Sequence, residues 1–171
     1  MGRYTYNTFR FEEEYLIMFD RRGNSVLLDL EDYSKVSKYH WLKDPSNNYW
    51  RCTRKTKEHG RMLLHRFIMG MPSRSVVVDH KFHNLDDCRK SQLRCCSQTE
   101  NMHNSYFDVS KSKSGHRGIT LTPKGKFQAR IWLNDKMIYL GTFDKLEEAI
   151  KIREEAEIKY FGEYSYRGEK V

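Results

Sequence analysis

The sequence predicts an α+β fold, because its strand patterns and its helix patterns occupy separate stretches of the chain. Two apolar runs joined at Gly23-Asn24 indicate a β-hairpin over residues 15–30. Three short alternating segments between residues 116 and 140, with turns at 123–125 and 134–135, indicate a three-stranded antiparallel meander. Each of these elements has a local sequence signal of its own.

A single helix is expected after the meander, over residues 144–161. Asp144 stands at the N-cap position with Glu147 three residues on, and the pair Phe161-Gly162 ends the pattern. Apolar side chains keep helical spacing between these ends, so the helix should cover the apolar face of the meander.

The composition favours a polyanionic partner. The 171 residues carry a net charge of +8 together with eleven tyrosines, nine phenylalanines and three tryptophans. Charge alone does not separate nucleic acid from anionic lipid. No apolar run approaches the roughly 20 residues of a membrane span, and no apolar segment resembles a secretory signal. We therefore expect a soluble, cytoplasmic protein with no membrane partner.

The four cysteines do not form a metal-binding pattern. Cys52, Cys88, Cys95 and Cys96 include no C-x-x-C pair, and neighbours in a strand point to opposite faces. We expect reduced thiols that fill small apolar sites, not a structural zinc site.

The region before residue 63 is expected to be a β-rich platform. Residues 32–41 have near-helical spacing, and residues 50–64 suit a second hairpin around a polar turn at 58–60. That hairpin carries five cations, namely Arg51, Arg54, Lys55, Lys57 and Arg61. They could follow a phosphate backbone, or they could be the charges that keep an edge strand solvated.

In the central region, candidate catalytic residues follow a short strand. The valines 76–78 read as a buried strand that presents Asp79 and His80, and residues 82–92 form a polar loop. A returning strand at 93–96 and a helix from Ser97 or Thr99 to Asn104 complete the order strand, loop, strand, helix.

Phosphodiester hydrolysis needs a base for water and a cation near the phosphate. The His80 imidazole, with an unperturbed pKa of about 6.5, suits the base. The Asp79 carboxylate and the Asn101 carbonyl oxygen suit one hard divalent ion, Mg²⁺ or Mn²⁺, whose shell water and phosphate oxygens would complete.

These residues resemble the HNH nucleases of the homing-endonuclease kind. The resemblance rests on residues 76–80, Asn84, Asp87, Arg89, 93–94, 100–102 and the upstream 64–66. It implies a ββα-metal finger in which His80 is the general base while Asp79 and Asn101 hold one divalent metal. His65 fits a structural hydrogen-bonding role or that of a second base, and His103 and Asn104 either join the metal shell or pack.

The chain departs from that family at three positions of the loop. His83 stands where the family commonly has Gly, and Cys88 and Gln92 stand where it has Asn. These positions shape the loop through local hydrogen bonds, whereas Asp79, His80 and Asn101 are intact.

The last part of the chain looks like an AP2 domain. The resemblance rests on the runs at 115–118, 125–131, 139–144, 147–149 and 160–164. It implies a three-stranded sheet that lies in the DNA major groove, with Arg130, Trp132 and Tyr139 at sheet positions that face DNA. Arg117 matches the arginine of the family's Arg-Gly opening and is a further expected DNA contact. Thr120 and Thr122 stand where plant members carry base-reading arginines, and Lys124 stands where they carry tryptophan, so the plant target does not transfer.

Other cations near this sheet are expected to contact phosphates or simply to solubilise the surface. They are Lys111, Lys113, Lys124 and Lys126, with Arg117 and Arg130 in the same role. For Trp132 the alternative to DNA contact is packing at the sheet edge.

Together these interpretations divide the chain into a β-rich platform (1–62), an HNH finger (63–107), a basic linker (108–115) and an AP2-like domain (116–166). They predict a monomeric, metal-dependent endonuclease that nicks double-stranded DNA and leaves 5′-phosphate and 3′-hydroxyl ends. It would be a homing or free-standing mobile-element enzyme, in the host cytoplasm if phage-encoded. The alternative is a sequence-specific DNA-binding regulator with an inert finger, and RNA is a third candidate substrate.

Overall fold

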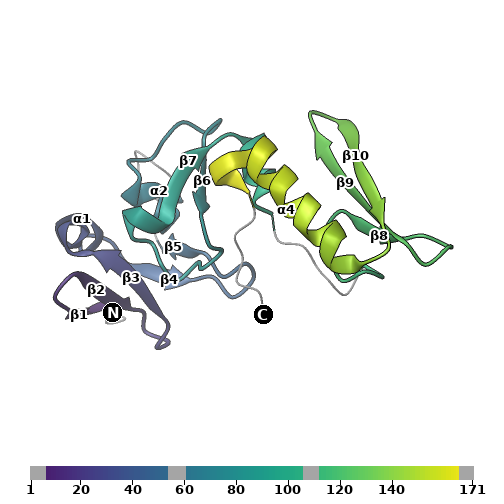
Figure 1. Cartoon of the computed structure of the whole chain (residues 1–171). Helices are drawn as coiled ribbons and strands as arrows, with labels where there is room; N and C mark the ends of the chain where they lie inside the picture. The colour runs from purple at the N-terminus through teal and green to yellow at the C-terminus, as the bar shows by residue number, and fades with distance from the viewer. Residues whose placement is uncertain (1–6, 54–60, 106–111, 166–171) are drawn as a thin grey trace. The chain divides into compact units, whose positions relative to one another are not determined.

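The computed structural model describes residues 7–53, 61–105 and 112–165 (Figure 1). Helices and antiparallel sheets both occur, so the predicted α+β class is confirmed. The chain forms two compact units, residues 1–98 and residues 99–171. No helix among the described residues combines the length and the apolar character that a membrane crossing requires.

The first unit begins with a three-stranded sheet of β1 (Thr8–Phe11), β2 (Tyr15–Phe19) and β3 (Ser25–Asp29). Strands β2 and β3 form the expected hairpin, whose turn uses Gly23 at φ 83°. Every second side chain of these two strands enters the core. Strand β1 was not predicted from the sequence, because its four residues are mostly exposed and show no clear alternation.

The helix expected at 32–41 is much shorter. Helix α1 covers only Tyr33–Val36, and Trp41 instead begins strand β4 (Trp41–Lys43), which pairs with β5 (Trp50–Cys52). Tertiary contacts explain the change. The buried Trp41 indole donates to the Val36 carbonyl at 3.0 Å, and the Asn7 side chain bonds both backbone groups of Trp41.

The structure describes the two ends of the expected second hairpin but not its middle, residues 54–60. The chain returns beside β5, where the Cys52 N–H donates to the Met62 carbonyl at 2.9 Å and Arg51 bridges Leu63. The turn predicted at 58–60 lies outside the described residues. Helix α2 (Leu64–Ile68) then leads away from this strand pair.

Strands β6 (Val77–His80) and β7 (Leu93–Cys96) form the antiparallel pair predicted for the central region. The loop between them is fixed to β3, because the Leu27 N–H donates to the Asp86 carbonyl and the Cys88 N–H donates to the Leu27 carbonyl, both at 2.9 Å. A single apolar cluster runs from Leu16 to Leu93. The N-terminal sheet therefore supports the loop that follows His80.

The second unit contains helix α3 (Gln98–His103, from its second residue on) and a sheet in the order β10-β9-β8. Its strands are β8 (Ile119–Leu121), β9 (Phe127–Leu133) and β10 (Lys136–Phe143). The β9–β10 turn has positive φ at both Asn134 and Asp135, 48° and 61°, as a two-residue type I′ hairpin requires. This is the three-stranded meander expected from the sequence.

Helix α4 (Leu146–Phe161) packs along this sheet (Figure 1). The predicted faces are confirmed, since Ala129 and Ile131 of β9 are fully buried and Trp132 is 63% exposed. The predicted Asp144 cap is wrong. Lys145 occupies the N-cap in an extended conformation, and the Asp144 carboxylate instead pairs with Lys126 at 3.0 Å.

The residues before β8 form a hydrogen-bonded turn, although the sequence assigned them to a linker. The Gly115 N–H donates to the Ser112 carbonyl at 3.0 Å, and the Ser114 hydroxyl donates to the Ile119 carbonyl at 2.6 Å. Serine hydroxyls that bond nearby backbone groups favour such turns. This stretch is therefore anchored to the start of the sheet.

Candidate active site and nucleic-acid interface

Strand β6 places Asp79 and His80 on opposite faces. Val78 and His80 point into the core of the first unit, while Val77 and Asp79 lie on the other face. The His80 side chain is almost completely buried, with 4% exposure. The two residues that the sequence combined into one site thus face different surroundings.

His80 lies among aromatic, imidazole and thiol groups. Its ring centroid is 5.1 Å from that of His65 and 6.3 Å from that of Tyr49, and its Nε2 is 3.6 Å from the Cys88 Sγ. Burial lowers the pKa of His80 to about 4, although Asp79 and Asp87 act in the opposite direction. The imidazole is neutral at physiological pH and can accept a proton.

His65 belongs to the same buried cluster. It lies in α2, is 5% exposed, and its ring is 5.1 Å from that of Tyr49. Burial, together with the neighbouring His80 and Arg66, lowers its pKa to about 3. Its buried position between Tyr49 and His80 suits a structural role.

Asp79 faces a buried cation across the strand pair. The register sets Asp79 opposite Arg94, and the Asp79 Oδ2 accepts hydrogen bonds from Nε and Nη2 of Arg94 at 3.0 and 2.8 Å. Both side chains are about nine-tenths buried. A guanidinium so placed competes with a metal ion for this carboxylate oxygen.

The oxygen donors of Asp79 and Asn101 have the chemistry that Mg²⁺ prefers. Asn101 lies in α3 of the second unit, whereas Asp79 belongs to the first. Within the described parts of the chain, no group of three or more His, Cys, Asp or Glu side chains is gathered to hold a metal. A site of the predicted kind would depend on two protein oxygens with water and phosphate oxygens.

The loop residues His83, Cys88 and Gln92 have identifiable structural roles. His83 has a φ of 61°, a left-handed conformation that glycine adopts more easily, and its N–H donates to the His80 carbonyl at 3.1 Å. Cys88 contacts His80 directly. The Gln92 carbonyl accepts from the Lys81 N–H at 2.9 Å, which closes the loop through the backbone.

Four cations gather in the first unit at β4 and β5. Arg51 forms an ion pair with Asp44 at 3.0 Å, and it lines a small hollow of about 220 Å³ with Arg22, Lys43 and Arg61. Arg22 and Lys43 were not singled out from the sequence, because only the fold brings them beside Arg51. Arg54 and Lys55, like Lys111, lie outside the described residues.

The outer face of the β8–β10 sheet carries exposed aromatic and basic side chains. Tyr139 pairs across the strands with Arg130, and Met137 pairs with Trp132. The exposures of Trp132, Tyr139 and Met137 are 63%, 55% and 47%. Arg130 donates to the Thr120 hydroxyl at 2.7 Å. This face offers rings and a guanidinium together.

The predicted lysines lie around the edge of this sheet. Lys113, Lys124 and Lys126 are exposed, and Lys126 is the one that pairs with Asp144. Their side chains extend the positive surface of the second unit beyond Arg130.

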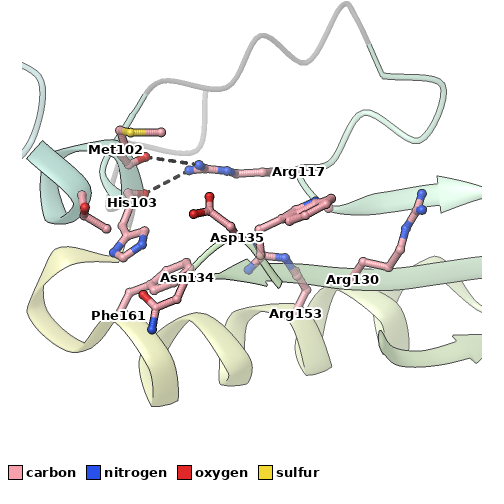
Figure 2. A pocket seen from close by; sticks show the side chains of 11 residues that line it. Met102, His103, Arg117, Arg130, Asn134, Asp135, Arg153 and Phe161 are labelled. Carbon is pink, nitrogen blue, oxygen red and sulfur yellow. Dashed lines mark hydrogen bonds between the residues drawn. The ribbon is translucent and has the colours of Figure 1, made fainter. Parts of the chain in front are cut away.

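Arg117 contacts the end of α3. Its guanidinium donates to the carbonyls of His103 and Met102 at 3.0 and 3.4 Å (Figure 2). It also donates to the Ser105 carbonyl at 3.3 Å. The His103 ring stacks on Phe161 with centroids 3.8 Å apart and an interplanar angle of 11°. Burial and Arg117 lower the pKa of His103. Arg117 and His103 thus fix α3 within the second unit.

Arg153 is a buried residue that the sequence analysis missed. It is 6% exposed and forms an ion pair with Glu157 at 2.8 Å. Its place among the apolar positions of α4, between Ala149 and Ala156, was the available signal. Burying a charged side chain is unfavourable unless the charge is paired or binds a ligand.

No protein-family model matches the chain, and no solved structure matches it.

Proposed function

We propose that this protein is a metal-dependent DNA endonuclease of the HNH type with an AP2-like DNA-binding domain. The supporting observation is the order of elements around Asp79 and His80. These residues end β6, β7 pairs with it in antiparallel fashion, and only Ser97 separates β7 from α3, which carries Asn101. A ββα-metal finger has this order of elements and these residue types.

His80 would take the proton from the attacking water, because its imidazole is neutral over the physiological range. Asp79 and Asn101 would hold one divalent ion, which when bound offsets charge on the phosphate. Arg94 would compete with this ion for the Asp79 Oδ2. Since His80 is 4% exposed, the loop after it must open when substrate binds.

The sheet of the second unit would bind duplex DNA with its outer face. Trp132, Tyr139 and Arg130 give that face the aromatic and cationic groups that suit contact with bases and phosphates. The cations beside Arg51 in the first unit would add phosphate contacts. One nuclease site in a monomer would cut one strand per event and leave 5′-phosphate and 3′-hydroxyl ends. A mobile-element role follows from the resemblance alone.

A plasmid-cleavage assay with Mg²⁺ or Mn²⁺ tests the proposal. We expect nicked product from the natural chain, and a loss of at least about 100-fold in His80→Gln with DNA binding retained. His116→Gln is the matched control, because His116 lies outside the β6–β7 pair. If the natural chain cuts no DNA to which it binds, the enzyme proposal is wrong.

The second candidate is a DNA-binding regulator with an inert finger. The ion pair that engages the Asp79 Oδ2 and the burial of His80 favour it. The regulator requires specific binding without cleavage under every metal condition, so the same assay separates the two. Cleavage of structured RNA in preference to duplex DNA would support the third reading of the substrate.

A further inference from the structure

The second unit encloses a cavity of about 660 Å³ between α3, the edge of the sheet and α4 (Figure 2). Its lining includes Arg117, Arg130 and Arg153, the ring of Trp132, and the hairpin turn at Asn134 and Asp135. A volume of roughly 300 to 1,000 Å³ is typical of sites for small ligands. The cavity is therefore large enough for a mononucleotide.

The charges around this cavity do not balance. Among the described residues, the hydrogen bonds of Arg117 all go to neutral backbone and hydroxyl oxygens, and Arg130 bonds a hydroxyl and a thioether. Asp135 is the one carboxylate among the lining residues, and Glu157 pairs with Arg153. Positive charge in a partly enclosed cavity attracts an anion more strongly than it would on an open surface.

Arg153 is held in a fixed place within this wall. A side chain on Gly118 would lie 2.4 Å from the Arg153 Nε, so the absent Cβ leaves the space that the guanidinium fills. The Nε is buried and has no hydrogen-bond partner among the described residues. Burial and the nearby Arg117 both lower the pKa of Arg153, while Glu157 raises it. A buried cation with an unused donor suits an anionic ligand.

Trp132 adds an aromatic surface at the same cavity. Its side chain is 63% exposed, whereas Trp41 and Trp50 are buried. Bases of any sequence stack on exposed aromatic rings, and arginines bind phosphates. The lining thus combines the two groups that recognise one nucleotide.

We propose that this cavity binds one nucleotide unit, with its phosphate at Arg117 and Arg153 and its base against Trp132. The site is separate from Asp79 and His80 and does not depend on cleavage. A free mononucleotide and a nucleotide within a single strand share this chemistry. In either case the ligand lies beside the end of α3, next to the outer face of the sheet.

Metal-free titrations of the full chain with thymidine 5′-monophosphate, thymidine and an oligothymidine of eight units test the proposal. Tryptophan fluorescence is the readout, because Trp132 is the exposed tryptophan. We expect saturable quenching by the monophosphate and at least tenfold weaker binding of thymidine. A monophosphate that binds more tightly than the oligothymidine identifies a free nucleotide as the ligand, and the reverse order identifies a strand.

Three variants and one control test where the ligand binds. Arg117→Gln and Arg153→Met should each weaken monophosphate binding about tenfold, and Lys151→Gln, an exposed change on the same helix, should not. Asp135→Asn removes the lining carboxylate at a positive φ that Asn tolerates, so the variant should fold and bind the phosphate several-fold more tightly. Equal binding of thymidine and its monophosphate, or no tightening in Asp135→Asn, overturns the proposal.

Because no metal is present and no bond is cut, these results do not depend on nuclease activity. An inactive nuclease with intact monophosphate binding would refute the proposed function and leave the cavity assignment in place. Cleavage without monophosphate or oligothymidine binding would support the proposed function and refute the cavity assignment.

Discussion

The imidazole rings of His65 and His80 lie 5.1 Å apart inside the first unit, with exposures of 5% and 4%. Their pKa values are lowered by burial to about 3 and about 4. In the unfolded chain both would protonate near pH 6.5. Two weakly basic histidines side by side make the first unit sensitive to acid.

The free energy of unfolding should therefore fall as the pH drops. Between pH 6.5 and pH 4 these histidines bind protons in the unfolded chain but not in the folded chain. Their contribution to the free energy of unfolding is therefore fully present above pH 6.5 and is lost as the pH falls toward 4. The loss should be about 3 kcal/mol for His80, since one pKa unit corresponds to about 1.4 kcal/mol. Urea unfolding at pH 7, 6, 5 and 4 measures it.

His65→Gln supplies the control for this acid sensitivity. A glutamine at 65 cannot titrate, so the slope of stability against pH should be shallower than in the natural chain. The variant's absolute stability at pH 7 is not the test. Identical slopes in the two proteins would contradict the assignment of the acid loss to this pair.

The same burial predicts the pH profile of cleavage. If His80 is the general base, kcat/KM should be level between pH 6 and 8, because the neutral imidazole predominates throughout. The activity should fall only as the pH approaches about 4. Initial nicking rates in a buffer series at constant ionic strength give the profile. An inflection near 6.5 would contradict this, because it would show that the imidazole is solvated in the free enzyme.

The ion pair between Asp79 and Arg94 predicts a structural effect apart from any metal. Asp79→Ala should lower stability by about 3 kcal/mol, because it leaves a buried guanidinium without its carboxylate. The double variant Asp79→Ala with Arg94→Met should recover much of that loss, since both charges are gone. Urea unfolding of the natural chain, the two single variants and the double variant measures this coupling. Additive losses of stability would mean that Asp79 and Arg94 are not coupled.

Local signals were enough to predict the hairpins, because their turns carry their own chemistry. Gly23-Asn24 and Asn134-Asp135 gave the correct turns, and alternation along β9 gave the correct faces. The shortened helix at Tyr33 and the cap at Lys145 could not be predicted, since they depend on contacts of Trp41 and on backbone conformation. Pattern identifies an element more reliably than its ends.

The surroundings of the candidate site were less predictable than its residues. Asp79 and His80 were named from their order in the sequence, but the Arg94 partner follows from strand register and the Cys88 contact from loop closure. The burial of Arg153 was not predicted, because a charged side chain is ordinarily expected to be exposed even when it lies among apolar positions of a helix. Side-chain partners across a fold need the tertiary structure.

DNA binding should depend strongly on salt. If about six phosphates are neutralised by the basic surfaces, log K should fall against log salt with a slope near −5. Arg130→Gln should make that slope less steep by about 1 if the guanidinium contacts a phosphate. Fluorescence anisotropy of a labelled duplex between about 50 and 300 mM salt gives both slopes. A flat response in the natural chain would contradict the charge argument.

Gly118, which directly precedes β8, has no room for a side chain, whereas Gly125 in the β8–β9 turn has open space. Both have positive φ, 70° and 76°, so alanine is strained at either position by about 1 kcal/mol. At Gly118 the added Cβ would also lie 2.4 Å from the Arg153 Nε and 2.5 Å from the Arg130 carbonyl oxygen, whereas nothing lies within 4 Å at Gly125.

Gly118→Ala should therefore destabilise the second unit by about 3 kcal/mol, and Gly125→Ala by about 1 kcal/mol. Urea unfolding followed by far-UV circular dichroism compares them. The backbone carbonyl cannot move without disturbing β9, so the Arg153 side chain must shift, and monophosphate binding should weaken in Gly118→Ala alone. Equal destabilisation of the two variants would mean that the guanidinium is not packed against Gly118.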